Sequence, residues 1–345
     1  MGTEATPLAE EPTTPRPGIR PAKVAGWALL CAIALAPVVA RSGYLSSMGC
    51  QIATSAIIVV GLGLLMGYAG QISLGHAAFY AIGAYSSAIL TTKAGVHPLL
   101  ALCAGAAASA LLALIVGTPA LRLHGHYLAM FTLGLGIIVQ IAIEQGKRLT
   151  NGFDGITGIP ALDLGFICLD SDPRMYGATV VALVGCVLAA RNLVDSRPGR
   201  ALRALHESEE AASACGVDVA RAKLEVFVLS AVMAAVAGSL YAHTIQFVSP
   251  EPFGVQFSVQ LVVMMVVGGS TSVGGPVAGA ALFTLVKQLL QDAGEKVRWV
   301  GYLDTVLFGS VLVLVVVFCP KGLAAVRLPA ILGGRTFVGE TRGDS

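Results

Sequence analysis

The longest charge-free stretch of this chain constrains its fold most strongly. From Ser42 to Thr92 the sequence runs 51 residues without an Asp, Glu, Lys or Arg. A bilayer core about 30 Å thick needs roughly 20 apolar residues per spanning helix, so the stretch predicts two spans and a turn. Its middle, residues 67–78, is polar and glycine-rich. Broken helices at membrane depth are typical of translocation sites, and we therefore expect a transport pathway at this break.

The overall composition is that of a multi-pass membrane protein. Of 345 residues, 55% are hydrophobic and 12% are charged, with a mean hydropathy of +0.78, whereas about 25% of residues are charged in soluble domains. The net charge of +2 is too small to indicate nucleic-acid binding. Seven cysteines show no CxxC pair, which indicates neither a disulfide framework nor a metal site. We expect no metal and no cofactor.

Charge-poor stretches predict an all-α protein with about ten transmembrane helices. Two of the later spans are short and flank a second glycine-serine break at residues 268–276. There Ser272-Val273-Gly274 matches Ser73-Leu74-Gly75, so two five-helix halves would form an inverted repeat. The alternative is a chance match in a chain with 41 glycines. The expected spans are residues 24–40, 50–66, 72–92, 97–117, 126–144, 175–193, 224–245, 256–269, 276–290 and 303–320.

Lys and Arg residues near the predicted helix ends set the expected orientation. An even number of spans places both termini in the cytosol. Residues 1–23 then form a disordered cytoplasmic tail, and the start of the next segment reads as an uncleaved first helix rather than a signal peptide. The other expected units are a transmembrane permease domain at 24–320, an external loop at 145–174, a cytoplasmic loop at 194–223 and a cytoplasmic C-terminal tail at 321–345.

Ionisable groups are scarce inside the predicted spans. No Asp or Glu lies well inside any of them, whereas carriers driven by ion gradients usually keep such a group. The energy for transport is therefore expected to come from elsewhere. His76, at the first break, is the strongest candidate for a membrane-embedded ionisable side chain. It is either a proton relay or a neutral imidazole whose partners are backbone carbonyls freed at the break.

Small polar residues cluster at both breaks and are the expected substrate pathway. One interpretation is helix capping, in which a short polar side chain accepts a hydrogen bond from a free N–H group at a helix start. The other adds contact with a carboxylate-bearing substrate, which suits the positive end of a helix dipole. Both remain open. The residues are Gln71, Ser73, Gly75, His76, Ser270, Thr271, Ser272 and Gly274.

An intramembrane serine hydrolase is a third function class to weigh. The Gly-x-Ser-x-Gly elbow is absent around Ser73 and Ser272. His243 could partner one of these serines, but a nucleophile without an identifiable base is not a site. The chain also has no Gly-x-x-x-x-Gly-Lys-Ser/Thr phosphate loop. We assign no catalytic residue.

The cytoplasmic loop contains the only long polar segment after the first tail with helical character. Residues 199–216 predict one short amphipathic helix with Gly216 just past its C-terminus. Such a helix is a natural docking element for a partner protein. A solvated surface helix is the alternative. Its apolar stripe comprises Ala201, Leu202, Leu205, Ala212 and Cys215.

Several motifs together resemble the LivM-type permease family of branched-chain amino acid ABC transporters. The resemblance covers roughly residues 45–325, in order and at the expected spacing. Glu210-Ala211-Ala212-Ser213-Ala214-Cys215-Gly216 also resembles the EAA-x-x-x-G signature of ABC importer permeases, although the expected downstream Ile-x-Leu-Pro is not evident. The motifs are residues 67–79, 150–160, 199–204, 249–254 and 268–279.

This resemblance implies a subunit of the bacterial cytoplasmic (inner) membrane that forms half of a pore for hydrophobic amino acids. The implied partners are a second, LivH-type permease, two cytosolic ABC ATPases, a periplasmic or surface substrate-binding protein, and membrane lipid. ATP hydrolysis would belong to the ATPases, so the chain itself is not expected to be an enzyme. The residues implied in ATPase coupling are Arg200, Glu209, Glu210, Ala211, Ala212 and Gly216.

Two other transport functions remain as alternatives. A permease of the same broad family could carry urea, amides, sugars or another small solute. An ion-coupled secondary carrier would work without ATP and would depend on His76. The two differ from the main interpretation in substrate or in energy source, and both keep the helical membrane fold.

Overall fold

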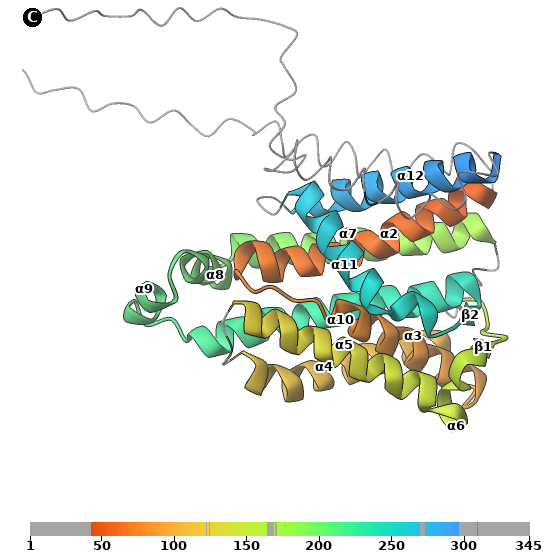
Figure 1. Cartoon of the computed structure of the whole chain (residues 1–345), viewed down its shortest axis with the longest axis horizontal. Helices are drawn as coiled ribbons and strands as arrows, with labels where there is room; N and C mark the ends of the chain where they lie inside the picture. Colours follow the sequence, from red (N-terminus) through yellow and green to blue (C-terminus); the bar gives the residue numbers. More distant parts are fainter. Residues whose placement is uncertain are drawn as a thin grey trace, which may run out of the picture.

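The computed structural model describes residues 43–121, 123, 125–163, 169, 171–269, 273–296 and 309, and these residues form a helical bundle (Figure 1). The helices α8 and α9 lie at one end of the bundle, while α6 and the paired strands β1 and β2 lie at the opposite end. The elements are α2 (Gly43–Gly63), η1 (Leu64–Tyr68), α3 (His76–Thr92), α4 (Pro98–Ala120), α5 (His126–Gln145), α6 (Lys147–Thr150), η2 (Gly152–Asp154), β1 (Ile156–Thr157), α7 (Asp172–Asp195), α8 (Arg197–Glu207), α9 (Glu209–Ala214), α10 (Val219–Ile245), β2 (Phe247–Val248), η3 (Glu251–Phe253), α11 (Val255–Gly268) and α12 (Gly275–Lys296).

The helical, multi-pass character predicted from the sequence is confirmed. Among the described residues, five helices are long and apolar enough to cross a membrane. The predicted first span at 24–40 and both tails lie outside the described residues, as does the predicted tenth span at 303–320 apart from Gly309. The total of ten spans therefore stays a prediction. The five helices are Gly43–Tyr68, Pro98–Ala120, His126–Gln145, Asp172–Asp195 and Val219–Ile245.

Two predicted span boundaries were wrong. The helix expected at 72–92 begins only at His76, because residues 69–75 leave the helix after a π-helical turn and Gly70 adopts a positive φ of 67°. The helix expected at 276–290 runs instead from Gly275 to Lys296. By contrast α11, with 14 residues, is about 21 Å long at 1.5 Å per residue and stays shorter than a bilayer core.

The second break is described only in part. Gly269, Val273 and Gly274 are described, whereas Ser270, Thr271 and Ser272 lie outside the described residues. Each break separates the end of one helix from the start of the next, Tyr68 from His76 and Gly268 from Gly275. The inverted repeat itself remains a prediction.

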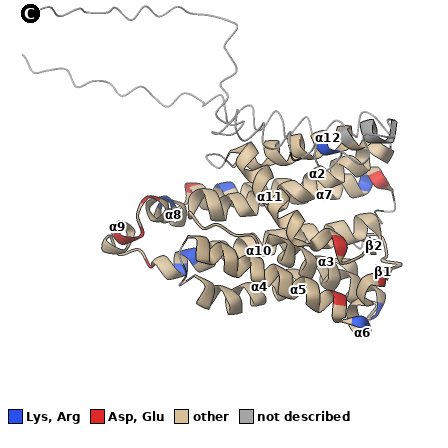
Figure 2. Ribbon diagram, viewed as in Figure 1, with Lys and Arg blue, Asp and Glu red and all other residues tan. Residues whose placement is uncertain are grey.

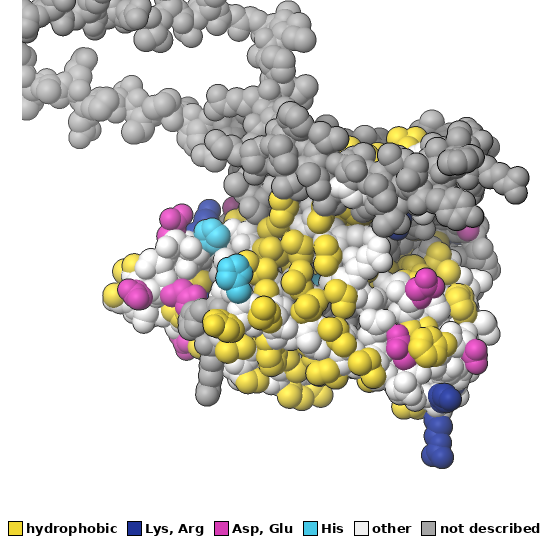
Figure 3. Space-filling view, in the orientation of Figure 1, with side chains coloured by type: hydrophobic (Ala, Val, Ile, Leu, Met, Phe, Trp, Pro, Cys, Tyr) yellow, Lys and Arg dark blue, Asp and Glu magenta, His cyan; other side chains and the backbone are white. Residues whose placement is uncertain are grey.

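Charged and apolar side chains divide the surface as a membrane protein requires. Lys, Arg, Asp and Glu gather toward the two ends of the bundle (Figure 2), and apolar side chains cover much of the middle of the face shown in Figure 3. The outer helices α4, α5 and α7 expose large apolar residues, where lipid tails would cover them. They include Leu111, Ile115, Tyr127, Met130, Ile138 and Val181.

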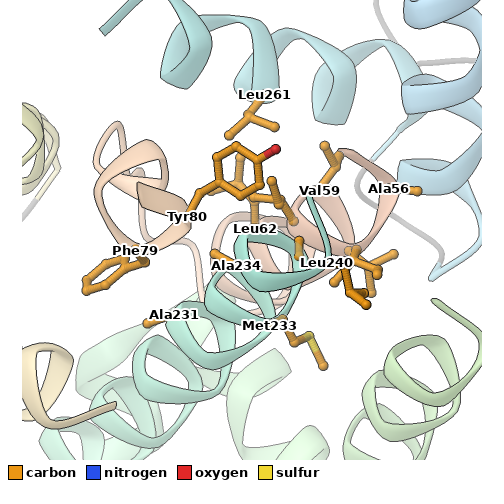
Figure 4. Close-up of a cluster of buried hydrophobic side chains, with 14 of the residues drawn as sticks. Ala56, Val59, Leu62, Phe79, Tyr80, Ala231, Met233, Ala234, Leu240 and Leu261 are labelled. Atoms are coloured by element: carbon orange, nitrogen blue, oxygen red, sulfur yellow. The ribbon is translucent and has the colours of Figure 1, made fainter. Parts of the chain in front are cut away.

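The helices α2 and α10 lie at the centre of the bundle. Most of their apolar residues are buried, whereas α4, α5 and α7 bury mainly one side. In Figure 4, side chains of α2 (Val59, Leu62), α3 (Tyr80), α10 (Leu240) and α11 (Leu261) lie in one shared core. Helix α4 packs on α10 through small residues, one of which, Ser109, donates a hydrogen bond to the Ala231 carbonyl at 3.0 Å.

Two glycines allow α3 and α10 to cross at backbone contact. A Cβ atom on Gly83 would lie 2.0 Å from the Ala235 carbonyl oxygen, and one on Gly238 would lie 2.0 Å from the Tyr80 carbonyl oxygen. Within a membrane, where lipid is as apolar as leucine, such small-residue contacts are a main source of helix association. This crossing fixes the position of α3 relative to α10, and both helices carry residues of the site described below.

We predict that Gly238→Ala destabilises the folded protein by more than about 3 kcal/mol, because overpacking alone typically costs 1–3 kcal/mol and here the obstacle is backbone. Thermal unfolding of the purified protein in nanodiscs measures the effect. Gly185→Ala is the matched control, since nothing lies within 4 Å of a Cβ atom there. Equal unfolding midpoints for the two variants would contradict the close crossing.

Candidate functional site

The segment 69–75 carries non-helical backbone into the interior of the bundle. Two of its buried or half-buried N–H groups have clear partners: that of Gln71 donates to the Leu65 carbonyl at 3.1 Å, and that of Leu74 donates to Thr132 Oγ1 of α5 at 3.0 Å. Buried backbone without partners would cost several kcal/mol per group in an apolar medium. The irregular segment is therefore held in place by the helices around it.

Helix α3 begins without a cap from its own chain neighbours. Its N-cap residue is Gly75, which offers no side chain, and the Ala77 N–H donates instead to Ser258 Oγ of α11 at 3.3 Å. The capping role expected of Gln71 and Ser73 is thus taken by a residue from another helix. Ser73 Oγ accepts only a long bond of 3.5 Å from the Gly75 N–H.

His76 is fully enclosed and bonded to hydroxyl groups. It is 1% exposed, its Nδ1 lies 3.1 Å from Ser73 Oγ, and its Nε2 lies 2.5 Å from Ser230 Oγ of α10. The backbone carbonyls expected as its partners are replaced by hydroxyls. Among the described contacts of His76 no carboxylate would stabilise an imidazolium, so this geometry suits a neutral ring that joins segment 69–75 to α10.

Gln71 is the least satisfied polar residue of the segment. Its side chain is 4% exposed, and neither its Oε1 nor its Nε2 has a hydrogen-bond partner among the described residues. Leaving a buried amide unpaired costs about 1–3 kcal/mol or more. Among the described residues, both atoms of the Gln71 amide are thus available for further hydrogen bonds.

The start of the segment also touches the helix pair at the end of the bundle. A Cβ atom on Gly70 would lie 2.9 Å from His206 Nδ1 of α8. Segment 69–75 thus runs from α8 to the interior, where His76 meets α10, and this path is visible in Figure 1 between α2 and α3. Because Gly70 contacts α8, a movement of α8 would displace the segment directly.

The amphipathic helix expected at 199–216 is in fact two helices. Helix α8 ends at Glu207 and α9 begins at Glu209, with Ser208 between them in extended conformation. The Ser208 Oγ accepts the Ala211 N–H at 3.2 Å and so starts α9 as an N-cap. Gly216 has a positive φ of 82°, which suits its expected place after the helix end.

The residues implied in ATPase coupling differ in their exposure to solvent. Arg200, Glu210, Ala211 and Gly216 are exposed, whereas Ala212 is buried. Glu209 is half-buried and forms a salt bridge at 2.5 Å with Lys223 of α10, whose side chain is 4% exposed. Glu209 therefore ties α9 to α10 and is not freely available to a partner.

His243 pairs with a serine other than those considered for a hydrolase. Its Nε2 lies 2.9 Å from Ser87 Oγ, its Nδ1 lies 2.8 Å from the Pro160 carbonyl, and Ser239 donates to Ser87 at 2.9 Å. All of these groups are packed between α3, α10 and the segment that follows β1. The arrangement fastens that segment to the bundle, and it faces no described pocket.

A pocket of about 350 Å³ lies among α2, α3, α10, η3, α11 and α12. Its inner wall comes from buried Tyr80, Met264 and Phe283, with Thr54 beside them. Its rim is polar and exposed, and comprises Gln51, Glu251, Gln256 and Lys287. The volume falls within the range of small-ligand sites.

The predicted pathway residues that the structure describes do not line this pocket. Gln71, Ser73, Gly75 and His76 form the segment described above, and Gly274 precedes α12, where its carbonyl accepts the Ala278 N–H. The sequence did contain a signal for the pocket that our prediction missed. Gln51, Gln256 and Gln260 are amides inside charge-free apolar stretches, and the last two are four residues apart on one helix face.

Comparison with known proteins places most of the chain in one family. The family model described as the permease component of branched-chain amino acid transport systems matches residues 44–316. The high-affinity branched-chain amino acid transport system permease protein LivM of Salmonella typhimurium is 33% identical over 303 residues, covering 81% of this chain and 70% of its own length. These matches confirm the resemblance found in the motifs.

Two further relatives are more distant. The permease protein LivH of the same system in Salmonella typhimurium is 26% identical over 289 residues, covering 78% of this chain and 91% of its own length. The fructose import permease protein FruG of Bifidobacterium longum is 26% identical over 304 residues, covering 83% of this chain and 85% of its own length. The similarity therefore extends to permeases whose names state different cargo.

We predict that Gln71→Met raises the free energy of unfolding by about 1–3 kcal/mol, because it removes an unpaired buried amide, and at the same time lowers transport. The two effects are measured by thermal unfolding in nanodiscs and by uptake in reconstituted vesicles. Gln51→Met, at the exposed pocket rim, is the control for stability and should change it by less than about 0.5 kcal/mol. A less stable Gln71→Met protein would show that the amide is paired in the folded state.

Proposed function

Because this chain belongs to the permease family of branched-chain amino acid transport systems, we propose that it forms half of the translocation pore of an ATP-driven importer for branched-chain amino acids. The chain is a multi-pass transport subunit, and transport subunits of this family are not enzymes. A second, LivH-type permease would supply the other half of the pore. The bilayer would cover the exposed apolar faces of α4, α5 and α7.

One observation supports this proposal above the rest: segment 69–75 joins the proposed coupling region to the interior. Gly70 packs against His206 of α8 at one end of the segment, and His76 bonds Ser230 of α10 at the other. Alternating access needs a movable element that both the energy source and the pathway contact. The segment has those two contacts, and its Gln71 amide has no hydrogen-bond partner among the described residues.

The proposed docking site for the two cytosolic ATPases is the exposed side of α8 and α9. It comprises Arg200, Glu210, Ala211 and Gly216, with Glu209 and Ala212 supporting it from beneath. This orientation puts both termini in the cytosol and puts the loop 145–174, with β1 and β2, outside. A periplasmic or surface substrate-binding protein would then deliver cargo at the end that carries η3 and the pocket.

The proposed substrate pathway passes the pocket and segment 69–75. Gln71, Ser73, Gly75 and His76 would line its inner part, together with Ser270, Thr271, Ser272 and Gly274 of the second break. The similarity to FruG favours a second candidate, a permease for a sugar or another small uncharged solute such as urea or an amide. An ion-coupled carrier would instead require His76 to change charge. The partners of the His76 ring are neutral hydroxyl groups, which do not favour a charged imidazolium.

We predict that the tagged chain, purified from its native membrane in mild detergent, brings a second permease and Walker-motif ATPases with it. In vesicles the purified complex should take up leucine only with ATP. Unlabelled isoleucine and valine should compete with leucine, whereas fructose and urea should not. A chain that purifies alone and moves leucine without ATP would contradict the proposal, and competition by fructose alone would favour the second candidate.

We predict that Glu210→Lys lowers ATP-driven uptake at least about tenfold, because a like charge at a docking interface costs several kcal/mol. Membrane insertion and the unfolding midpoint should not change, since Glu210 is exposed. Asp154→Lys makes the same charge reversal at the opposite end of the bundle and should leave ATPase recovery normal. If Glu210→Lys retains full uptake, the docking assignment to α9 is wrong.

A further inference from the structure

The pocket among α2, α11 and α12 has a mostly apolar buried wall and a polar, exposed rim. Its buried wall offers the ring of Tyr80, the thioether of Met264 and the ring of Phe283. Thr54 adds little polarity there, because its hydroxyl donates to the Cys50 carbonyl of its own helix at 2.8 Å. Buried Thr284 of α12 adds one more hydroxyl. The wall is otherwise apolar, so a ligand would place an apolar group against Tyr80, Met264 and Phe283.

The rim of the same pocket carries opposite charges. Among the described residues that line it two are charged, Glu251 on η3 and Lys287 on α12, and both side chains are exposed. Gln51 and Gln256 lie beside them on the rim, and Gln260 follows one turn further in. Carboxylate, ammonium and amide groups at one opening suit a ligand head that carries both charges.

Aromatic rings hold η3, and with it Glu251, in place. The ring of Tyr80 lies 5.1 Å from that of Phe253 and 5.3 Å from that of Phe257, measured between centroids, and Tyr241 lies 5.5 Å from Tyr80. Phe253 itself is 2% exposed. The rim position of Glu251 is thus set by the packing of its neighbour Phe253.

We propose that this pocket binds an apolar amino acid in its zwitterionic form. Lys287 contacts the carboxylate, Glu251 contacts the ammonium group, and the apolar side chain enters toward Tyr80, Met264 and Phe283. The inference rests on the proposed import function and adds to it a binding station in the permease itself, separate from the predicted pathway residues. The family match assigns none of these roles.

The test uses ligands that lack one charge at a time. The complete transporter, in nanodiscs and without its binding protein, is titrated with radiolabelled L-leucine, with L-leucinamide, which lacks the carboxylate, and with 4-methylpentanoate, which lacks the ammonium group. Lys287→Met should weaken leucine and 4-methylpentanoate about tenfold and leave leucinamide unchanged. Glu251→Gln should weaken leucine and leucinamide about tenfold and leave 4-methylpentanoate unchanged.

Matched controls keep the result specific. Lys147→Met and Asp154→Asn remove the same charges from exposed positions outside the pocket and should change no affinity, and Lys287→Arg should retain leucine binding. The inference is overturned if each pocket variant weakens all three ligands equally or none of them. If the wild-type complex imports leucine with ATP while the pocket variants match the controls, only this inference fails. If the wild type neither imports leucine nor retains ATPases, the proposed function fails instead.

Discussion

Backbone hydrogen bonding within the membrane is the constraint on which this structure depends. Seven residues, 69–75, are not helical, and four of them, Ala69, Gln71, Ser73 and Gly75, are buried. Their polar groups cannot turn to lipid for partners. Within the segment, the Leu74 N–H donates to Thr132 of α5 and the Gln71 N–H donates to the Leu65 carbonyl. Just past it, at the start of α3, Ser258 of α11 accepts the Ala77 N–H and Ser230 of α10 bonds the His76 ring. The packing of the central helices is thus also the means by which the irregular segment is tolerated.

The sequence predicted those parts of the fold that follow from local composition. Charge-free stretches mark most of the described helices, and the glycines and polar residues around Gly70 mark the break. The start of α3 at His76 was not predictable from hydropathy, because residues 72–75 are apolar or small and only tertiary contacts pull them out of the helix. The division of α8 from α9 depends likewise on Ser208, which can cap one helix or continue another.

The site was predicted less fully than the fold, and for a physical reason. A polar break is visible along the chain, and so Gln71, Ser73 and His76 could be named. The pocket is formed where six separate elements meet. The amides Gln51, Gln256 and Gln260 are visible in the sequence, but only the fold shows that they share one opening. In the sequence, nothing distinguishes Glu251 from any other acidic residue of a loop. Its place at the pocket rim depends on how Phe253 packs against Tyr80.

Helix α10 connects regions that are otherwise far apart. It begins beside the salt bridge between Lys223 and Glu209, bonds His76 through Ser230 and reaches the pocket with Tyr241. Its 27 residues make an unbroken rod of about 40 Å. A rod tilts as one body, so inward movement at one end requires outward movement at the other. If the bundle pivots about the glycine crossing with α3, opening toward one side of the membrane would close the other without any separate gate.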